Sequence, residues 1–334
     1  MVMGTRWGIV GYGWVARDYM APGIRASGGE VAAICDCALA AHGHAANFGA
    51  RSYAELGAML DDGGLDAIYV ATPNHLHAGV IEQVAPYGIP ILCEKPLAHS
   101  AADLERIGRV AESGEVRMGT AFDQRYHPAH ALIRERIASG DLGTVTAIRI
   151  VYCCWVDPNW SRNTGDNWRA RPECAGGGAV LDLAPHGLDL AQFLMDEPVQ
   201  NLTMRLQRRI HDYAVEDGGM TIGAMPSGTL FSSHTSYNWP EELPRRRLEI
   251  AGTEAMIVAT DTMGQDAGGH MTRIDAKDGS TQSLAFDTGT SPFTRQAAAF
   301  SEFVRNGTGD FDINRDIAAA RQFFAAFEEA RTCL

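Results

Sequence analysis

The stretch Trp7-Gly8-Ile9-Val10-Gly11-Tyr12-Gly13-Trp14-Val15-Ala16 decides the fold of the N-terminal part of the chain. Its first four residues predict a short buried strand, and the remainder is a G-x-G-x-x-A pattern. In this pattern the first glycine permits a tight turn, the second lets a pyrophosphate approach the backbone, and the small last residue lets the next helix pack closely. Residues 17–27 can form that helix, and phosphate would then meet the N–H groups at its start. The stretch therefore predicts a dinucleotide-binding βαβ unit.

A second predicted strand, residues 31–35, ends at Asp36. An acid at this place accepts hydrogen bonds from the adenosine ribose hydroxyls and repels a 2′-phosphate. No arginine follows Asp36 closely, so the sequence favours NAD over NADP. The alternative is that Asp36 only begins the next turn.

The alternation of strands and helices continues to about residue 120. Helices are expected at 38–48, 53–60, 76–87 and 101–113, and strands at 66–71, 89–93 and 116–120. Strands separated by helices of this length predict a parallel, doubly wound sheet. In such sheets the carboxyl ends of the strands face the ligand. Two polar segments lie there: Thr72-Pro73-Asn74-His75-Leu76-His77 and Glu94-Lys95-Pro96.

The second half of the chain has a different pattern, typical of an α+β domain with an antiparallel sheet. Helices are expected at 130–138, 296–305 and 314–331, and strands at 145–155, 202–210, 220–225, 228–237, 246–251 and 255–259. A polar loop spans 157–174, and residues 264–269 have the composition of a flexible loop. We therefore expect two domains: a Rossmann domain at 1–122, and a substrate-binding and oligomerisation domain at 123–334.

Between these strands, three glycines (176–178) lead into a helix that ends near Met195. Asp182, His186 and Asp189 are spaced i, i+4, i+7, which places them on one helix face. An acid and an imidazole one turn apart suit proton transfer, because histidine titrates near working pH. The alternative is a polar stripe facing water. Pro185 is tolerable if the helix begins near Leu181 or Asp182, so that the proline lies in the first turn.

Composition excludes several classes of function. The formal charge of −13 over 334 residues disfavours nucleic acid and anionic membranes as partners. The seven cysteines are odd in number and irregularly spaced, which indicates free thiols in a reducing compartment and predicts no metal site. Neither a signal peptide nor an apolar run long enough for a bilayer is visible, so we expect a cytoplasmic protein.

Taken together, these motifs resemble the Gfo/Idh/MocA family, named for glucose-fructose oxidoreductase and inositol dehydrogenase. The matching segments occur in the family's order: 11–16, Thr72-Pro73-Asn74 with His77, Glu94-Lys95-Pro96, Arg125-Tyr126, Trp168-Arg169, and the helix with Asp182, His186 and Asp189. The resemblance implies a Rossmann domain and a second domain with a large, mostly antiparallel sheet. It also implies a nicotinamide cofactor and a sugar, cyclitol or polyol substrate. The broad exposed sheet expected in the second domain favours a homodimer or homotetramer.

The resemblance also implies roles for single residues. Lys95 would hydrogen-bond the reacting hydroxyl, and His186 would be the general acid/base. Asp182 would lie beside the substrate or orient His186, and Asp189 would be a substrate-binding or structural neighbour. The implied cofactor-binding set is Gly11, Tyr12, Gly13, Trp14, Val15, Asp36, Thr72, Pro73, Asn74, His77, Glu94 and Lys95. The implied substrate-binding set is Arg125, Tyr126, Trp168, Arg169, Asp182, His186 and Asp189.

The leading hypothesis is an NAD(P)-dependent oxidoreductase acting on CH–OH groups. An NAD-using glycosidase or lyase on the same fold is an alternative. In such an enzyme the cofactor oxidises a ring carbon only transiently and is regenerated. A non-catalytic dinucleotide-binding sensor is a third. The combination of Lys95, Asp182 and His186 argues against a sensor, because binding alone needs no proton-transfer groups.

Overall fold

The computed structural model describes residues 4–157 and 167–334. Contacts divide the chain into two compact units, Met1–Ala121 with Phe293–Ala318, and Phe122–Pro292 with Ala319–Leu334. The expected division had placed residues 293–318 in the second domain. They group with the first because Phe300 packs against Trp7, with ring centroids 5.4 Å apart. Phe311 also lies so close to Gly119 that a Cβ there would be 2.6 Å from its ring.

The first unit is built on a six-stranded sheet in the order β3-β2-β1-β4-β5-β6, in which every pair is parallel. The order reverses between β1 and β4, as in a doubly wound fold. The strands are β1 (Arg6–Val10), β2 (Glu30–Cys35), β3 (Arg51–Tyr53), β4 (Ala67–Val70), β5 (Ile91–Glu94) and β6 (Met118–Ala121). Strand β3 was not expected from the sequence: it pairs with β2, and its last residue, Tyr53, was predicted as the start of a helix at 53–60.

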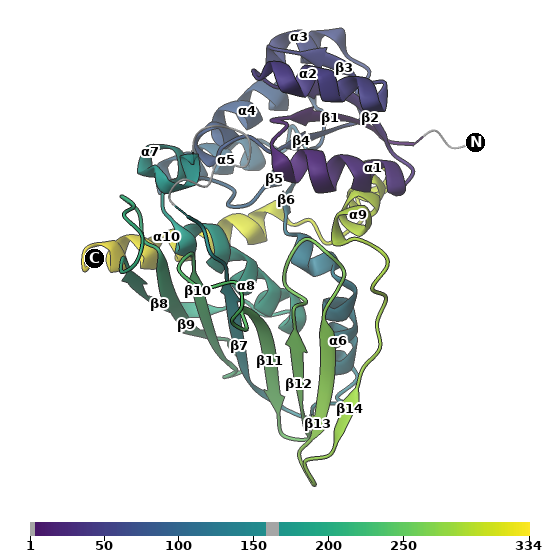
Figure 1. Cartoon of the computed structure of the whole chain (residues 1–334). Coiled ribbons are helices and arrows are strands. Elements are labelled where there is room, and N and C mark those ends of the chain that lie inside the picture. The colour runs from purple at the N-terminus through teal and green to yellow at the C-terminus, as the bar shows by residue number, and fades with distance from the viewer. Residues whose placement is uncertain (1–3, 158–166) are drawn as a thin grey trace. The chain divides into compact units, whose positions relative to one another are not determined.

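Helices connect these strands (Figure 1). They are η1 (Ala16–Met20), α1 (Ala21–Ala26), α2 (Leu39–Ala45), η2 (Ala46–Phe48), α3 (Leu56–Asp62), η3 (Asn74–Leu76), α4 (His77–Val84), η4 (Ala85–Tyr87) and α5 (Ala101–Ser113). Helix α9 (Pro292–Asn306) follows β14 in the chain and belongs, from Phe293 on, to this unit as well. The first helix contains a π-turn at η1, directly before Pro22. Proline has no N–H and its ring crowds the preceding turn, so the wider π-turn accommodates it.

The second unit contains an eight-stranded sheet in the order β14-β13-β12-β11-β7-β10-β9-β8, in which only the pair β7–β10 is parallel among the described strands. Its strands are β7 (Val145–Cys153), β8 (Gln200–Gln207), β9 (Gly218–Ala224), β10 (Leu230–Ser236), β11 (Arg246–Gly252), β12 (Ala255–Thr260), β13 (His270–Asp275) and β14 (Thr281–Ser283). Both β13 and β14 were missed, because the mostly half-buried β13 and the short, exposed β14 carry little apolar alternation.

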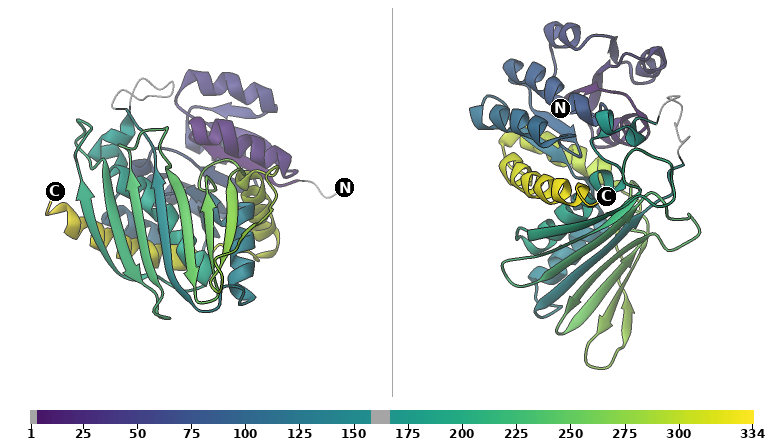
Figure 2. Two further views of the ribbon diagram at one scale, coloured as in Figure 1. Left: turned by 60° about the horizontal axis from the view of Figure 1, so that its bottom comes forward. Right: turned by 90° about the vertical axis from the view of Figure 1, so that its left-hand side faces the viewer.

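The second unit contains the helices η5 (Asp123–Tyr126), α6 (Pro128–Ala138), η6 (Trp168–Ala170), α7 (Pro172–Ala175) and α8 (Ala179–Met195). Of these, α8 and its neighbour α6 lie on one face of the sheet (Figure 2). The last helix, α10 (Ile313–Arg331), contributes to both units. Helix α8 packs directly on β7, β9 and β10. No helix in the described parts of the chain is both long and apolar enough to cross a bilayer.

Candidate functional site

In the first unit, the glycine turn after β1 is closed on one side and open on the other. Gly11 has a φ of +84°, and a Cβ on it would lie 2.6 Å from the backbone nitrogen of Thr72. Only glycine fits there. Gly13 is exposed, and a Cβ on it would meet no described protein atom within 4 Å. Ala16 is fully buried, so the helix packs closely on the sheet. This is the combination of a tight turn and open backbone that a pyrophosphate requires.

Asp36 fastens the end of β2 to this turn. One carboxylate oxygen accepts the N–H of Tyr12 at 2.6 Å, and the other accepts the N–H of Ala38 at 2.7 Å. A carboxylate has about four lone-pair positions, so these bonds leave capacity for a ribose diol. The two interpretations of Asp36 are therefore compatible, because the same side chain begins the next turn and presents negative charge beside the glycines.

His77 is part of the expected cofactor set, but its ring lies inside the protein. It is fully buried, with Nδ1 3.1 Å from the carbonyl oxygen of Pro96 and Nε2 3.0 Å from that of Thr72. Burial lowers the pKa of His77 to about 4, against the opposing effect of these carbonyls. This geometry favours a structural role, in which a neutral His77 joins the loops after β4 and β5. Thr72, Pro73 and Asn74 belong to the loop that it holds.

Lys95 follows β5 directly and is half-buried. Its backbone N–H donates to Glu94 Oε2 at 3.2 Å, while Tyr69 donates its hydroxyl to Glu94 Oε1. Glu94 therefore braces the backbone from which Lys95 projects. Of the 28 lysines and arginines in the chain, only Lys95 and Lys277 are lysines.

In the second unit, the glycines before α8 serve helix packing. A Cβ on Gly178 would lie 2.0 Å from the carbonyl oxygen of Glu216, and one on Gly177 would lie 2.6 Å from Phe327. The buried Glu216 side chain then accepts the N–H groups of Gly178, Val180 and Leu181 at 2.8, 3.1 and 3.4 Å. It caps the helix and occupies the place where a helix N-terminus could bind an anion.

The expected position of Pro185 in a first turn is wrong, since α8 begins at Ala179 and contains Pro185 in its interior. Proline cannot donate to the carbonyl of Leu181 one turn earlier. The helix persists because its N-terminus is capped and its surface is buried on nearly all sides, including Leu181, Ala184, Leu188 and Ala191. Burial against the sheet outweighs the local cost of the proline.

The alternative of a water-facing polar stripe on α8 is also wrong. His186 and Asp189 are each only 5% exposed, and Asp182 is half-buried. Each of the three has a different polar partner: Tyr237, just after β10, for Asp182, and two residues of η5 for His186 and Asp189. Such burial of polar side chains with partners is what a functional or structural cluster requires.

Asp182 and His186 have separate partners. Tyr237, just after β10, donates its hydroxyl to Asp182 Oδ2. His186 Nδ1 lies 3.4 Å from Asp123 Oδ1, and the edge of Tyr152 meets the imidazole with ring centroids 5.4 Å apart. The sequence left two roles open for Asp182, orienting His186 or lying beside the substrate. Because Asp123 and Tyr152 contact the His186 ring and Asp182 accepts from Tyr237, the second alternative is favoured for Asp182.

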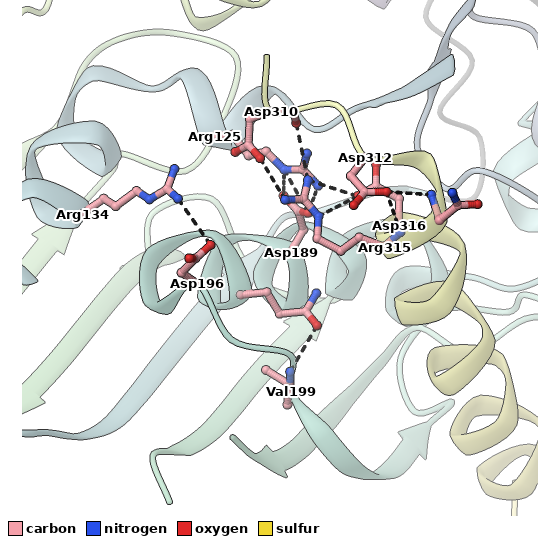
Figure 3. A network of polar contacts seen from close by, with 11 residues as sticks. Arg125, Arg134, Asp189, Asp196, Val199, Asp310, Asp312, Arg315 and Asp316 are labelled. Carbon is pink, nitrogen blue, oxygen red and sulfur yellow. Dashed lines mark hydrogen bonds and ion pairs between the residues drawn. The ribbon is translucent and has the colours of Figure 1, made fainter. Parts of the chain in front are cut away.

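Arg125 and Asp189 form a buried ion pair (Figure 3). Arg125 Nε donates to Asp189 Oδ1 at 3.1 Å and to Oδ2 at 2.9 Å, and Nη2 donates to Oδ1 as well. The guanidinium carbon also lies over the Phe122 ring, 5.0 Å from its centroid. The side chains are 2% and 7% exposed. This geometry favours a structural role, in which the pair joins η5 to α8, over the substrate contacts expected of both residues. Tyr126, on the same turn, is half-buried.

Trp168 and Arg169 pack on each other, with the guanidinium carbon 4.4 Å from the indole centroid. The positive charge of Arg169 also opposes the burial that raises the pKa of Tyr237, so Arg169 lies on the Asp182 side of the unit. Trp160 and Arg162, in the same polar loop, lie outside the described residues. The loop 264–269 is anchored, because the Gly264 carbonyl accepts from Gln124 and the Asp266 carbonyl contacts His127.

Residues 5–122 match the model of the oxidoreductase family with an NAD-binding Rossmann fold, and residues 130–258 match that of the GFO/IDH/MocA C-terminal domain. A 1,5-anhydro-D-fructose reductase from Ensifer adhaerens is 30% identical over 278 residues, which are 82% of this chain and 81% of that protein. The chain belongs to the Gfo/Idh/MocA family of oxidoreductases.

Other members of the Gfo/Idh/MocA family align over nearly the full length. D-xylose 1-dehydrogenase (NADP(+)) 2 from Haloferax volcanii is 27% identical over 328 residues, 97% of each chain. The solved levoglucosan dehydrogenase complex with NADH and levoglucosan has a TM-score of 0.86 at 22% identity and covers 98% of each chain. An aldose-aldose oxidoreductase from Caulobacter crescentus, complexed with glycerol, has the same TM-score, 0.86, at 20% identity. These two structures establish the shared fold. The chain is thus an enzyme of an NAD-binding family whose named relatives are sugar dehydrogenases and reductases.

Four residues around α8 were not singled out as site residues by sequence analysis: Asp123, Tyr152, Glu216 and Tyr237. For Asp123 a signal existed, since it stands two residues before Arg125 in a matched motif. Tyr152 lies at an inward position of a strand, where sequence gives no means to separate a core aromatic from a neighbour of His186.

Proposed function

We propose that this enzyme transfers a hydride between a nicotinamide cofactor and a hydroxyl or carbonyl group of a sugar, cyclitol or related polyol. The observation that carries the proposal is the buried polar face of α8, where His186 lies between Asp123 and Tyr152. A histidine held in this way in a sugar oxidoreductase family is suited to moving the hydroxyl proton.

The first unit fits a dinucleotide. Backbone groups from Gly11 to Val15 would hold the pyrophosphate at the open side of Gly13, and Asp36 would accept the ribose hydroxyls. The acid favours NAD over NADP, although one relative is named as NADP-dependent. The bound nicotinamide would supply the hydride acceptor or donor.

In the direction of oxidation, the carbinol must lose both a hydride and its hydroxyl proton. We assign proton acceptance to His186, which returns the proton in reduction. Lys95 would hydrogen-bond the same oxygen and stabilise the negative charge that develops on it. Asp182, oriented by Tyr237, would bind a neighbouring substrate hydroxyl and so position the carbon that reacts.

A panel of aldoses, anhydrosugars and cyclitols, each assayed with NAD and NADP, tests the proposal. We expect at least one to give a stoichiometric change in reduced cofactor absorbance that His186→Ala abolishes. Product formation with no net change in reduced cofactor would contradict hydride transfer as the overall reaction and would indicate the glycosidase or lyase alternative. Tight dinucleotide binding with no turnover of any substrate would indicate a sensor.

We also propose a homodimer or homotetramer that uses the large sheet. Met220, Ile222 and Leu230, on the adjacent strands β9 and β10, are 54%, 52% and 61% exposed. Apolar side chains exposed side by side are typical of association surfaces. Light scattering of the protein and of an Ile222→Lys variant checks this, and a monomeric unmodified protein would contradict it.

A further inference from the structure

We propose that Asp123 is the positioning residue of His186 and that it holds the imidazole with its proton on Nδ1. The inference deepens the proposed function and rests on it, because it assumes that His186 moves the substrate proton. It assigns to Asp123 the orienting role that sequence alone had offered to Asp182.

The contact between the two side chains is buried from both sides. Asp123 Oδ1 lies 3.4 Å from His186 Nδ1, and each side chain is 6% exposed. Water screens a charge weakly at such a position, so the carboxylate acts strongly on the ring. A distance of 3.4 Å is long for a hydrogen bond, and catalytic contacts often shorten only when substrate is bound.

Asp123 is itself held in place, so its direction is fixed. The fully buried side-chain amide of Gln124 donates to Asp123 Oδ2 at 2.8 Å and to the Gly264 carbonyl at 2.9 Å. The backbone carbonyl of Gln124 contacts His130 Nδ1 at 2.8 Å, which fastens the same turn to α6. One carboxylate oxygen is thereby engaged with Gln124, and the other faces His186.

The chemical consequence concerns the two ring nitrogens. A carboxylate beside Nδ1 favours a proton there, because that N–H can donate to it. The neutral ring then keeps its lone pair on Nε2, which is the nitrogen able to accept a substrate proton. After transfer, the negative charge of Asp123 stabilises the imidazolium, as an acid does in other acid–histidine pairs.

Other polar side chains near His186 in the described parts of the chain are engaged differently. Tyr152 stays neutral, because burial raises the pKa of its hydroxyl. The positive charge of Arg246 opposes this rise in pKa, and the negative charge of Asp123 adds to it. Asp182, one turn before on α8, accepts from Tyr237, and Asp189, one turn after, is bound by Arg125.

The test uses the full-length protein labelled with ¹⁵N in its imidazoles, with the His186 signals assigned as those absent from His186→Asn. The unmodified protein should show the Nδ1–H form. In Asp123→Asn the titration midpoint of this ring should fall by about one pH unit or more, since an opposite charge within a few ångströms is lost. The rise of kcat/KM for oxidation with pH should move down by the same amount, and kcat should fall at least about tenfold. Asp266→Asn, an exposed change of the same charge, should leave the ring unaltered.

Should Asp123→Asn not fold, Gln124→Met provides a second variant, which leaves the carboxylate but removes its amide donor. It should shift the titration and the pH profile in a way that Asp266→Asn does not. An unchanged tautomer and midpoint in the folded Asp123→Asn, or in Gln124→Met where Asp123→Asn does not fold, would overturn the inference and leave the proposed function standing. A shifted ring signal in Asp123→Asn, combined with full turnover in His186→Asn, would instead overturn the catalytic role of His186.

Discussion

The hydroxyl of Tyr237, the residue that follows β10, donates a hydrogen bond to the carboxylate of Asp182 on α8. Tyr237 is 2% exposed, and burial raises its pKa well above the usual value, so the phenol stays protonated and remains a donor. The relationship fixes the direction of a carboxylate that is itself only half-buried. It makes the Asp182 side chain a pre-oriented acceptor instead of a mobile surface group.

Tyr237→Phe removes this donor and keeps the ring. We expect kcat/KM to fall about tenfold while the free energy of unfolding falls by only about 1 kcal/mol, the usual contribution of one hydrogen bond. Tyr213→Phe is the matched control, since that buried hydroxyl donates to the Val156 carbonyl and should affect stability alone. Equal kinetics for the two variants would remove Asp182 orientation from the mechanism.

Lys95→Met tests the second group assigned to the reacting oxygen. The substitution keeps an unbranched side chain that is one atom shorter and removes its charge, so turnover should drop on the order of a hundredfold or more. Cofactor affinity, followed by quenching of tryptophan fluorescence, should persist. Lys277, the other lysine of the chain, is exposed, and Lys277→Met should have no kinetic effect. Near-normal turnover of Lys95→Met would exclude Lys95 from the chemistry.

Asp36 should set the preference for NAD. Its carboxylate lies against the glycine turn, where it suits a diol and repels a phosphate. We expect the unmodified protein to bind NAD more tightly than NADP, and Asp36→Asn to lose about tenfold in NAD affinity while losing less for NADP. Fluorescence titration with both cofactors checks this. Tighter binding of NADP to the unmodified protein would contradict the assignment.

The architecture was predictable because local patterns and tertiary structure agree. The strands and helices of the first unit could be predicted from the residues of each segment alone. Their order then placed the glycine turn, the acid after β2 and the polar residues at the ends of β4 and β5. The missed strands β3, β13 and β14 are short or half-exposed, so pairing with neighbours defines them more than their own residues do.

The site was less predictable, since its contacts join distant parts of the sequence. Periodicity placed Asp182 and His186 on one helix face, but could not show that the ring faces Asp123 from another element. It also could not show that Arg125 and Asp189 neutralise each other. Both are side-chain pairings over 60 residues or more, which the helical period does not encode.

The Arg125–Asp189 pair gives a stability prediction. Asp189→Ala removes the buried carboxylate that pairs with the Arg125 guanidinium and should cost about 3–5 kcal/mol, with a matching fall in the unfolding midpoint. The double variant Arg125→Met with Asp189→Leu removes both charges and should recover most of this loss. If the double variant lost as much free energy of unfolding as Arg125→Met and Asp189→Leu lose in sum, the ion pair would not be the cause of the instability.

His130 gives a prediction for the pH dependence of stability. It is fully buried in the second unit, with Nδ1 2.8 Å from the Gln124 carbonyl and Nε2 3.1 Å from the Thr262 hydroxyl. Burial, reinforced by the neighbouring His127, lowers the pKa of His130 to about 3. An unfolded chain would protonate this residue near pH 6.5, so between about pH 6.5 and 3 the unfolded state binds more protons than the native one.

Stability should therefore be present above about pH 6.5 and decline as the pH falls toward 3, because acid favours the state that binds protons. His77 contributes with the same sign in the first unit, where burial lowers its pKa to about 4. Thermal unfolding midpoints measured from pH 7 to pH 5 should fall more steeply for the unmodified protein than for His130→Gln, although the variant starts lower at pH 7. His270→Gln, an exposed replacement, should keep the original slope. A slope in His130→Gln equal to that of the unmodified protein would show that protonation of His130 does not drive the acid sensitivity.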